Sequence, residues 1–365
     1  MHIVIFGLTV SSSWGNGHAT LWRALLKALA KRRHTATFYE HDVSWYADNR
    51  DDWTAPDGIA LHLYSSFDEI RSEALRDLNV ADIGIFTSYC PDGPEAAELI
   101  LDSRAGIKCF YDLDTPVTLN SLRSGEPVVY LPPDGLADFD LVLSYTGGRA
   151  LTELQSRLHA RSVAPLYGSV DPEAHYPISP LDQYRGILSY LGTFAADRQV
   201  ALETLFLEPA RRLPEKTFQL AGAQYPDSLS SLPNIAFVPH LSPHLHPAFF
   251  CSSRATLNIT RGVMAQYGYC PSGRLFEAAS CGVPIVSDGW DGLAMFFTPG
   301  EEILRVDTPE DVIEALSLPE VDLRRIADSA RERTLANHTA ERRVMELEDI
   351  CDRVTDRMQP ASESK

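Results

Sequence analysis

The sequence predicts two α/β domains of similar size, each built on a parallel β-sheet covered by helices. Three observations favour this fold class. The chain has 365 residues, enough for two hydrophobic cores at roughly 100–200 residues per domain. Short apolar runs alternate with helical segments through both halves of the chain, which is the pattern of parallel sheets. A proline-rich interval, residues 168–184, separates the halves and lacks apolar periodicity, as expected of an interdomain connection.

Six strands and three helices are expected in the first half, and they alternate. The strands are His2–Phe6, Ala36–Tyr39, Ile83–Phe86, Ile107–Tyr111, Leu141–Ser144 and Val163–Leu166, and the helices are His18–Arg33, Glu95–Ser103 and Arg149–Leu158. The strands are short, continuously apolar runs, which is typical of parallel strands buried on both faces.

The same alternation restarts after the proline-rich interval. Strands are expected at Ile187–Leu191, Thr217–Leu220, Ala255–Ile259 and Pro284–Ser287, and helices at Arg198–Arg211, Gly273–Cys281, Asp322–Ala336 and Glu341–Met358. The last helix, residues 341–358, is expected to pack back on the first domain. The polar tail, 359–365, is expected to be disordered.

The composition is that of a globular protein and disfavours several classes of function. Hydrophobic residues make up 44% of the chain and charged residues 22%, as in soluble domains. Fifty Asp and Glu against 32 Lys and Arg give a formal net charge of −18, which disfavours binding to nucleic acid or anionic membranes. No segment has the ~18 apolar residues of a membrane-spanning helix, and the chain starts without the charged region of a signal peptide. We expect a soluble, cytoplasmic protein.

Several sequence patterns are absent. The six cysteines are widely spaced and none forms a C-x-x-C pair, so reduced core thiols are expected rather than disulfides or a zinc site. The chain also lacks a Walker A loop, a G-x-S-x-G elbow and an H-E-x-x-H helix. ATPase, esterase and zinc-protease activities are therefore disfavoured.

The run Gly15-Asn16-Gly17 lies between the first strand and the first helix. Glycines at such a place let backbone N–H groups approach a ligand. The dinucleotide-binding pattern needs a third glycine, but Thr20 stands at that position, although Glu40 follows the second strand where a ribose-binding acid belongs. The run is therefore interpreted as a substrate-contacting loop, with a structural turn and a dinucleotide site as alternatives.

Asp112, Asp114 and Thr115 lie at the carboxyl end of a predicted buried strand, where ligands bind in open α/β sheets. Asp112 and Asp114 also form a D-x-D pattern, but alternate residues of a strand point to opposite faces, so one metal reaches both only if the strand has ended. Asp114 is interpreted as an acceptor-contacting residue or general base. A metal site and a helix-capping or turn role remain alternatives.

A strand–loop–helix–strand unit over residues 257–288 carries the clearest functional pattern. The run Pro271-Ser272-Gly273 begins a helix, and its exposed N–H groups are suited to a diphosphate. Arg261 or Arg274 would add positive charge. Glu277, one turn into the helix, can accept hydrogen bonds from two ribose hydroxyls. The alternative is that Glu277 only interacts favourably with the helix dipole in the first turn.

The pattern R-L-F-E-A-A-S-C-G-V-P-I-V-S-D, residues 274–288, resembles the donor-nucleotide segment of GT-B glycosyltransferases, specifically the CgeB-like (spore-maturation-type) family. Further matching segments occur in the same order along nearly the whole chain; they are Gly15–Gly17, Phe110–Pro116, Leu143–Gly148, Pro165–Asp171, Leu191–Phe194 and Asp197-Arg198. The resemblance implies the GT-B fold, in which two Rossmann-like domains face each other across a cleft. It also implies an N-terminal acceptor-binding domain, 1–168, a linker, 169–184, and a C-terminal nucleotide-sugar-binding domain, 185–340.

The resemblance also implies roles for individual residues. Glu277 matches the ribose-binding glutamate, and Gly192 and Thr193 match the loop near the donor phosphates. Arg198 matches the basic residue that steadies the diphosphate leaving group. Residues Val238 to His240 match the segment that lies against the nucleobase.

One departure from the wider retaining group concerns a second glutamate. That group has E-x7-E, but Tyr269 stands eight residues before Glu277, so the glutamate that contacts the sugar is missing. His240, His244 and His246 form a pattern that suggests a metal site, but prolines interrupt this stretch and no acidic or Cys ligand lies nearby in the sequence.

These observations predict a glycosyltransferase that uses a nucleoside-diphosphate sugar, with UDP as the expected nucleotide, and needs no metal or other cofactor. The partners are the donor and a hydroxyl acceptor, without nucleic acid; the sequence predicts no oligomeric state. Asp114 or His18 is expected to take the acceptor proton, with a helix-start role as the alternative for His18. A nucleotide-sugar epimerase, a noncatalytic nucleotide- or sugar-binding protein and, more distantly, a dehydrogenase are the alternatives.

Overall fold

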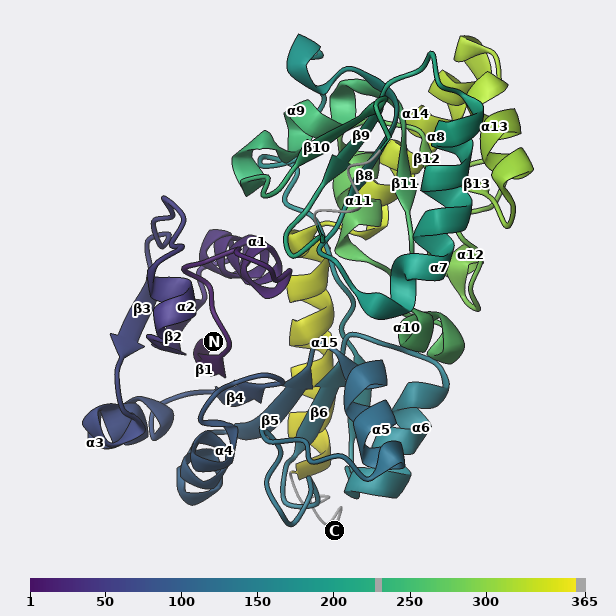
Figure 1. Ribbon diagram of the computed structural model, residues 1–365. Helices are drawn as coiled ribbons and strands as arrows, with labels where there is room; N and C mark the ends of the chain where they lie inside the picture. The colour runs from purple at the N-terminus through teal and green to yellow at the C-terminus, as the bar shows by residue number, and fades with distance from the viewer. Residues whose placement is uncertain (227–231, 359–365) are drawn as a thin grey trace. The chain divides into compact units, whose positions relative to one another are not determined.

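The computed structural model describes residues 1–226 and 232–358, so the predicted disordered tail, 359–365, lies outside the described residues. The chain forms two compact units (Figure 1). The first contains Met1–Ser12, His18–Tyr167 and the residues from Ala340 onwards, and the second contains Ser13–Gly17 and Gly168–Thr339. The first unit is therefore assembled from both ends of the chain.

The first unit is built on a parallel sheet of seven strands in the order β3-β2-β1-β4-β5-β6-β7. The strands are β1 (His2–Gly7), β2 (Thr35–His41), β3 (Ile59–Tyr64), β4 (Ile83–Thr87), β5 (Ile107–Asp112), β6 (Leu141–Ser144) and β7 (Val163–Pro165). Phe6 in the central strand β1 pairs with Tyr39 of β2 and Phe86 of β4. Because successive strands are added on opposite sides of β1, the sheet has a switch point between β1 and β4.

Helices cover both faces of this sheet, as predicted. They are α1 (His18–Lys31), α2 (Ser44–Ala47), α3 (Phe67–Leu78), α4 (Gly93–Asp102), α5 (Thr115–Ser124), α6 (Arg149–Leu158) and α15 (Ala340–Met358). The strand side chains alternate between the faces. Ile3 and Ile5 join the core cluster that contains α1 and α15, whereas Phe6 lies against Phe67 of α3.

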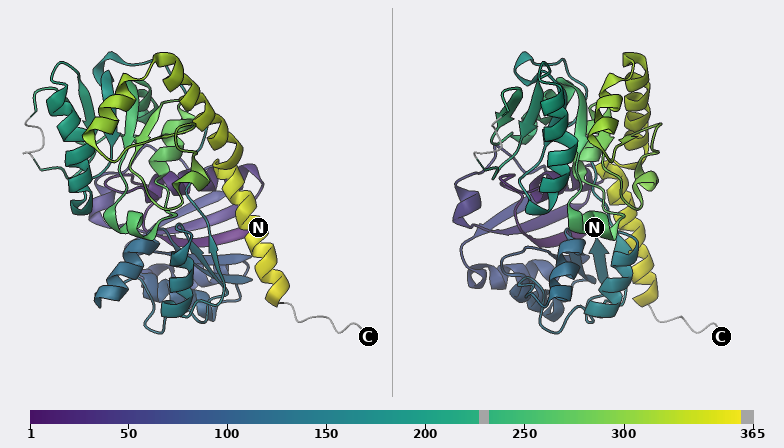
Figure 2. Two further views of the ribbon diagram at one scale, coloured as in Figure 1. Left: turned by 90° about the vertical axis from the view of Figure 1, so that its right-hand side faces the viewer. Right: turned by 45° about the vertical axis from the view of Figure 1, so that its right-hand side comes forward.

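The C-terminal helix α15 packs against α1, as the sequence predicts. Figure 2 shows it as one long helix beside the strands of the first unit. Its buried residues recur every three or four positions; they are Ala340, Arg343, Val344, Leu347, Ile350, Cys351 and Val354. This spacing gives the helix one apolar face, which completes the core of the first unit.

The second unit is built on a parallel sheet of six strands in the order β10-β9-β8-β11-β12-β13. The strands are β8 (Gly186–Leu191), β9 (Phe218–Ala221), β10 (Ile235–Val238), β11 (Ser253–Asn258), β12 (Ile285–Ser287) and β13 (Leu304–Arg305). The order repeats that of the first sheet, with a switch point between β8 and β11. Two parallel α/β units therefore confirm the predicted fold class.

The remaining helical elements belong to the second unit. They are η1 (Asp182–Tyr184), η2 (Ala196–Arg198), α7 (Gln199–Leu202), η3 (Glu203–Leu207), α8 (Glu208–Arg212), η5 (Pro243–Leu245), α9 (His246–Cys251), α10 (Gly262–Tyr267), α11 (Gly273–Ser280), α12 (Leu293–Phe296), α13 (Pro309–Ser317) and α14 (Glu320–Asn337).

The predicted helix Arg198–Arg211 corresponds to a continuous helical run from Ala196 to Arg212 whose middle, η3, is a wider π-type turn. Pro209 is the second residue after this turn. Proline has no N–H to give to the preceding turn of an α-helix, and a widened turn is one way in which a helix accommodates that loss.

Apart from the segment Ser13–Gly17, which groups with the second unit, the chain passes from one unit to the other at residues 167–168 and again at 339–340. In the second unit Val170 pairs with Thr339, and its N–H donates to the carbonyl of His338 at 3.1 Å. In the first unit the Arg343 Nε–H donates to the carbonyl of Tyr167 at 3.0 Å. The two crossings are therefore joined by hydrogen bonds in the first unit and in the second unit.

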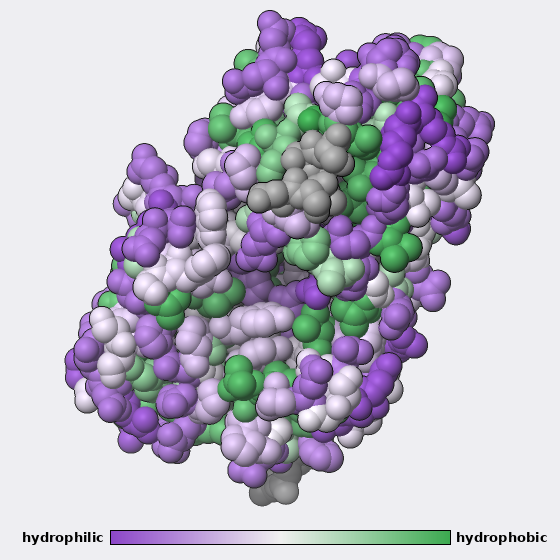
Figure 3. Space-filling view, viewed as in Figure 1, coloured by the Kyte–Doolittle hydropathy of each residue, from purple (hydrophilic) through white to green (hydrophobic). Residues whose placement is uncertain are grey.

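The face of the molecule in Figure 3 carries mainly hydrophilic residues, with smaller groups of hydrophobic residues between them. Among the described residues, none of the helices combines the length and the apolar character needed to cross a membrane.

Candidate functional site

Two predicted donor-binding segments lie at the switch point of the second sheet. Gly192 and Thr193 follow β8 directly, and Arg261 is the third residue after β11. Parallel strands end at the same edge of a sheet, and ligands of open α/β sheets bind where neighbouring strands diverge. The fold therefore brings these residues to the expected edge.

Two glycines let the backbone pass closely at this edge. A Cβ on Gly222 would lie 1.9 Å from the carbonyl oxygen of Gly192, and Gly222 has a φ of 151°. A Cβ on Gly192 would lie 2.7 Å from Nη2 of Arg274 and 2.9 Å from the hydroxyl of Tyr190. The loop after β8 thus lies directly against the guanidinium of Arg274, which a side chain at position 192 would displace.

Arg198 and Arg274 bring two positive charges to this loop. Arg198 Nη1 donates to the carbonyl of Thr193 at 3.2 Å, and the Arg274 guanidinium lies 5.1 Å from the ring centre of Tyr190. Burial lowers the pKa of Arg274 from its ordinary value, and the charge of Arg198 lowers it further. Neither Nε–H has a hydrogen-bond partner in the described part of the chain. Two cations with unused donors favour an anionic ligand.

A network of hydrogen bonds at the ends of two strands positions the guanidinium of Arg274. Its Nη1 donates to Oδ1 of Asn258 at 3.1 Å, and Nδ2 of Asn258 donates to the hydroxyl of Ser287 at 3.0 Å. Asp288 accepts from the backbone N–H of Thr260 at 2.9 Å, and burial raises the pKa of its carboxyl above its usual range. The network uses the end residues of β11 and β12, so the sheet itself orients the guanidinium.

The predicted helix start at Pro271-Ser272-Gly273 is the first turn of α11. Ser272 is at the N-cap position, but its side chain makes no capping hydrogen bond. A serine oxygen at this position normally accepts a hydrogen bond from one of the free N–H groups of the first turn. Ser272 does not accept such a bond. The first turn therefore keeps donors for a ligand. The predicted cation Arg261 instead faces Asp197, with 3.4 Å between Nε and Oδ2.

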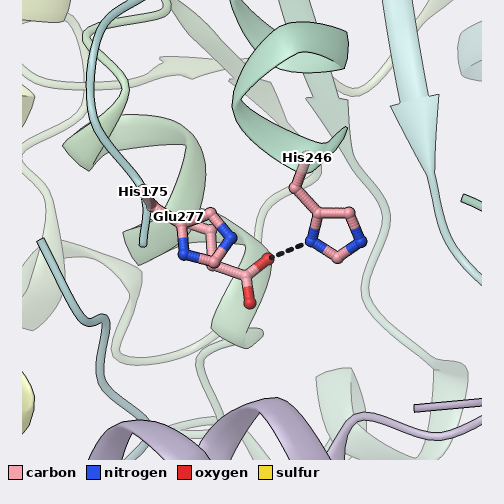
Figure 4. A group of neighbouring side chains, drawn as sticks. All are labelled: His175, His246 and Glu277. Carbon is pink, nitrogen blue, oxygen red and sulfur yellow. Dashed lines mark ion pairs between the residues drawn. The ribbon is translucent and has the colours of Figure 1, made fainter. Parts of the chain in front are cut away.

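Glu277 lies on α11 next to two histidines that the sequence does not place beside it (Figure 4). One oxygen of Glu277 is 3.8 Å from Nδ1 of His246, and a ring nitrogen of His175 lies within 4.8 Å of both. Burial lowers the pKa of His175 and of His246 to about 4. Both rings are therefore neutral at pH 7 beside an acidic residue.

The histidine pattern of the sequence is not brought together as a group. His246 joins His175 and Glu277, whereas His240 and His244 belong to no group with metal-binding spacing within residues 1–226 and 232–358. Val238 ends β10 and accepts a hydrogen bond from the N–H of Gly222 at 3.0 Å. The predicted nucleobase segment thus begins at the same sheet edge as the arginines.

In the first unit the fold brings His18 and Asp114 together. His18 begins α1, Asp114 is at the N-cap position of α5, and Nε2 of His18 is 2.9 Å from Oδ2 of Asp114. Their side chains are 12% and 18% exposed, so both stay accessible. A carboxylate that holds an imidazole in this way fixes its tautomer and orientation.

Asp112 and Thr115 lie beneath this pair. Asp112 ends β5, and burial raises its pKa to about 7. The hydroxyl of Thr115 bonds the carbonyl of Asp112 at 3.1 Å and the hydroxyl of Ser144 at 2.7 Å. Both side chains are fully buried, unlike Asp114. The D-x-D pattern therefore separates into one interior and one accessible carboxyl group.

Replacing Asp112 by asparagine is expected to stabilise the protein more at pH 8 than at pH 5. An unfolded Asp ionises near pH 4, but the folded state resists ionisation until about pH 7. Folding therefore loses stability as the pH rises between these values, by an amount of the order of a few kcal/mol. Thermal unfolding of both proteins at the two pH values measures the effect, and an equal difference in Tm at both would contradict it.

Glu40 does not have the surroundings of a ribose-binding residue. It is buried and accepts hydrogen bonds from the N–H groups of Val10 and Ser11 at 2.7 and 3.0 Å and from the hydroxyl of Thr9 at 2.8 Å. These bonds fix the loop after β1 and occupy both carboxylate oxygens. The dinucleotide alternative therefore has no free acid at this position.

The glycine run of this loop groups with the second unit. Gly15, Asn16 and Gly17 belong to the segment Ser13–Gly17, and Gly15 has a φ of 68°. That backbone conformation favours glycine. The predicted acceptor loop therefore leaves the first unit for five residues before α1 begins.

Comparison with known proteins supports this picture of the second unit. Residues 198–349 match the family model described as glycosyl transferase-like. This segment contains Arg198, Arg274 and Glu277. No curated protein sequence matches the chain.

Solved structures resemble the whole chain. Sucrose-phosphate synthase (tll1590) from Thermosynechococcus elongatus is 13% identical, with a TM-score of 0.72 and coverage of 98% of this chain and 100% of that chain. An alpha-glucosyltransferase in complex with UDP-glucose and DNA is 14% identical, with a TM-score of 0.73 and coverage of 96% and 99%. Anabaena Alr3699/HepE, in complex with UDP and glucose, is 12% identical, with a TM-score of 0.66 and coverage of 97% and 100%. These likenesses confirm the predicted GT-B fold class.

Proposed function

We propose that this protein is a glycosyltransferase that moves a glucose-type sugar from a UDP-sugar to a hydroxyl acceptor without an essential metal. The match of residues 198–349 to a glycosyl transferase-like family supports the reaction class. Structural neighbours in complex with UDP and glucose, or with UDP-glucose, support the donor. The resemblance of residues 274–288 to the CgeB-like proteins supports a relationship to that group.

The observation that carries this proposal is the pair of arginines at the switch point of the second sheet. The charge of Arg198 helps to lower the pKa of Arg274, and no carboxylate lies within ion-pair distance of either guanidinium in the described residues. A partly buried cation without a counter-charge costs stability. A diphosphate would supply the missing negative charge and accept from the free Nε–H groups.

The other predicted donor residues complete the site around that diphosphate. Gly192 and Thr193 would contact it from the loop after β8, and the first turn of α11 would add backbone donors. Glu277 would accept hydrogen bonds from the ribose, and Val238 with His240 would lie along the base. As the sugar leaves, negative charge grows on the diphosphate, which the arginines stabilise more strongly than they stabilise the intact donor.

The acceptor half of the reaction is assigned to the first unit. His18 Nε2 faces Asp114, and we assign His18 as the group that accepts the hydroxyl proton and Asp114 as the group that orients it. Thr115 supports the start of α5 from the interior. Gly15, Asn16 and Gly17, which group with the second unit, are assigned to the acceptor- or sugar-contacting loop.

One of the structural neighbours is in complex with DNA, but the charge of this chain favours a different partner. The formal net charge of −18 opposes association with another polyanion. We therefore propose an acceptor hydroxyl on a molecule other than nucleic acid.

Ligand-dependent thermal unfolding tests the donor assignment. UDP is expected to raise Tm more than ADP, GDP, dTDP or NAD at the same concentration, because a ligand of the folded state stabilises it by mass action. UDP-glucose is then expected to release UDP slowly to water and faster to a suitable acceptor, at the same rate in EDTA.

Each contrary result has its own meaning. Isomerised UDP-sugar without release of UDP would identify an epimerase. UDP binding without turnover over a broad set of acceptors would identify a noncatalytic binding protein. Stabilisation by NAD alone would overturn the donor assignment.

A further inference from the structure

Three elements of the second unit bring potential metal ligands to one point. His175 comes from the proline-rich interval, His246 begins α9, and Glu277 lies in the middle of α11 (Figure 4). One ligand atom from each lies within 4.8 Å of the other two. The hydroxyl of Ser280 on α11 donates to the carbonyl of His175 at 2.6 Å, which holds the interval against the helix that carries Glu277.

The two imidazoles lack the hydrogen bonds that buried polar groups normally make. His175 is 6% exposed, and the side chains of His246 and Glu277 are 12% and 14% exposed. Neither ring nitrogen of His175, nor Nδ1 of His246, has a hydrogen-bond partner in the part of the chain that the structure describes. Buried polar atoms are paired in the great majority of cases, so these three nitrogens point to a missing ligand.

A hydrogen bond to Glu277 does not account for the unpartnered nitrogen atoms of the two histidines. The His246–Glu277 separation of 3.8 Å is too long for a hydrogen bond. Burial keeps the pKa of both histidines well below 7, in spite of the opposing charges of Glu277 and Asp171. Neutral imidazole is the form that binds metals.

We propose that His175, His246 and Glu277 form a binding site for one divalent cation of the Zn²⁺ class. Two imidazoles and one carboxylate are a ligand set that Zn²⁺ uses with a fourth position left open. Bonds of about 2.0–2.2 Å to a tetrahedral ion place its ligands roughly 3.3 Å apart. From separations of up to 4.8 Å the ligand atoms therefore need to approach by up to about 1.5 Å, which is within the reach of side-chain rotation.

The site shares Glu277 with the proposed nucleotide. A cation on the Glu277 carboxylate would compete with the ribose hydroxyls for its oxygens. If the proposed donor function holds, Zn²⁺ acts as an inhibitor of nucleotide binding and takes no part in sugar transfer. The metal site itself does not depend on that function.

Direct metal titration of the full-length protein tests the site. Metal-free protein is titrated with Zn²⁺ by calorimetry in the absence of nucleotide, and with Co²⁺ while visible absorption is recorded. One equivalent is expected, with the spectrum of a tetrahedral ion bound by nitrogen and oxygen. His175→Gln and His246→Gln are each expected to weaken binding at least about tenfold, because even the loss of an outer partner of a metal ligand costs 10–100-fold.

His244→Gln is the matched control, since His244 is exposed and lies two residues from His246 but outside the group. Its Zn²⁺ affinity is expected to equal that of the wild type. Absence of stoichiometric binding to the wild type, or unchanged affinity in both His175→Gln and His246→Gln, would overturn the proposal. If one variant does not fold, as judged by circular dichroism, the other decides.

A competition measurement separates this inference from the donor assignment. Zn²⁺ is expected to raise the apparent Kd of UDP for the wild type at least about tenfold at saturation and to have no such effect on His175→Gln. If bound Zn²⁺ does not change the Kd of UDP, the proposed competition is wrong. Zn²⁺ binding without any UDP binding would leave the metal site and overturn the donor assignment alone.

Discussion

Arg274→Met is expected to weaken UDP binding by at least about 30-fold without lowering the Tm of the ligand-free protein. Loss of one partner from a desolvated, hydrogen-bonded charge pair costs roughly 2–5 kcal/mol. Stability responds differently, because burial already disfavours the charged guanidinium and methionine fills a similar volume without charge. Calorimetry with UDP and thermal unfolding of the free protein measure the two effects.

A loss of UDP affinity without a loss of Tm distinguishes a ligand-binding arginine from a structural one. Arg211→Met serves as the control, because Arg211 lies in the same unit but is 44% exposed and pairs with Glu203 and Glu208. It removes the same charge and is expected to leave UDP affinity unchanged. A large fall in Tm for Arg274→Met with unchanged UDP affinity would show that Arg274 only supports the fold.

His18→Asn is expected to lower the turnover of UDP-glucose by about 10²–10⁴-fold, the usual contribution of a general base, while the Kd of UDP stays within twofold of the wild type. Asp114→Asn is expected to lower turnover as well, because it removes the carboxylate 2.9 Å from the imidazole. Release of UDP to water measures turnover when no acceptor has been identified.

The first unit offers a matched control for this pair. His41 and Asp92 are also in contact, with 2.8 Å between Nδ1 and Oδ2. His41→Asn breaks a histidine–aspartate pair of similar separation, made through Nδ1 instead of Nε2, and is expected to keep full turnover. If His18→Asn and His41→Asn have equal activity, the assignment of His18 as the base fails.

The alternation of apolar runs and helices predicts the architecture because each buried parallel strand is a continuous hydrophobic segment. Strands and helices that lack this signal are not predicted. The strand β3 interrupts its apolar run with His62, and its central residues are partly exposed at the sheet edge. The helix α5 carries few apolar residues, and its bounds depend on Pro116 and on Gly125, whose φ is 72°.

The candidate site is predictable where its residues are close in the sequence. Arg274 and Glu277 occur in one recognisable segment, and the structure keeps them on one helix. The network through Asn258 and Asp288 and the approach of His175 to Glu277 join residues about 30 and 100 positions apart. No local pattern carries such contacts, because the strand order of the sheet creates them.

The return of α15 to the first unit has a consequence for biosynthesis. A ribosome that translates this chain releases every residue of the second unit before the helix that closes the core of the first. Until α15 has been synthesised, the apolar surface of the first unit that packs against it stays exposed. The second unit can already fold during this time. The first unit thus cannot be completed until the second has been synthesised, and a premature stop within the last helix leaves the first unit incomplete.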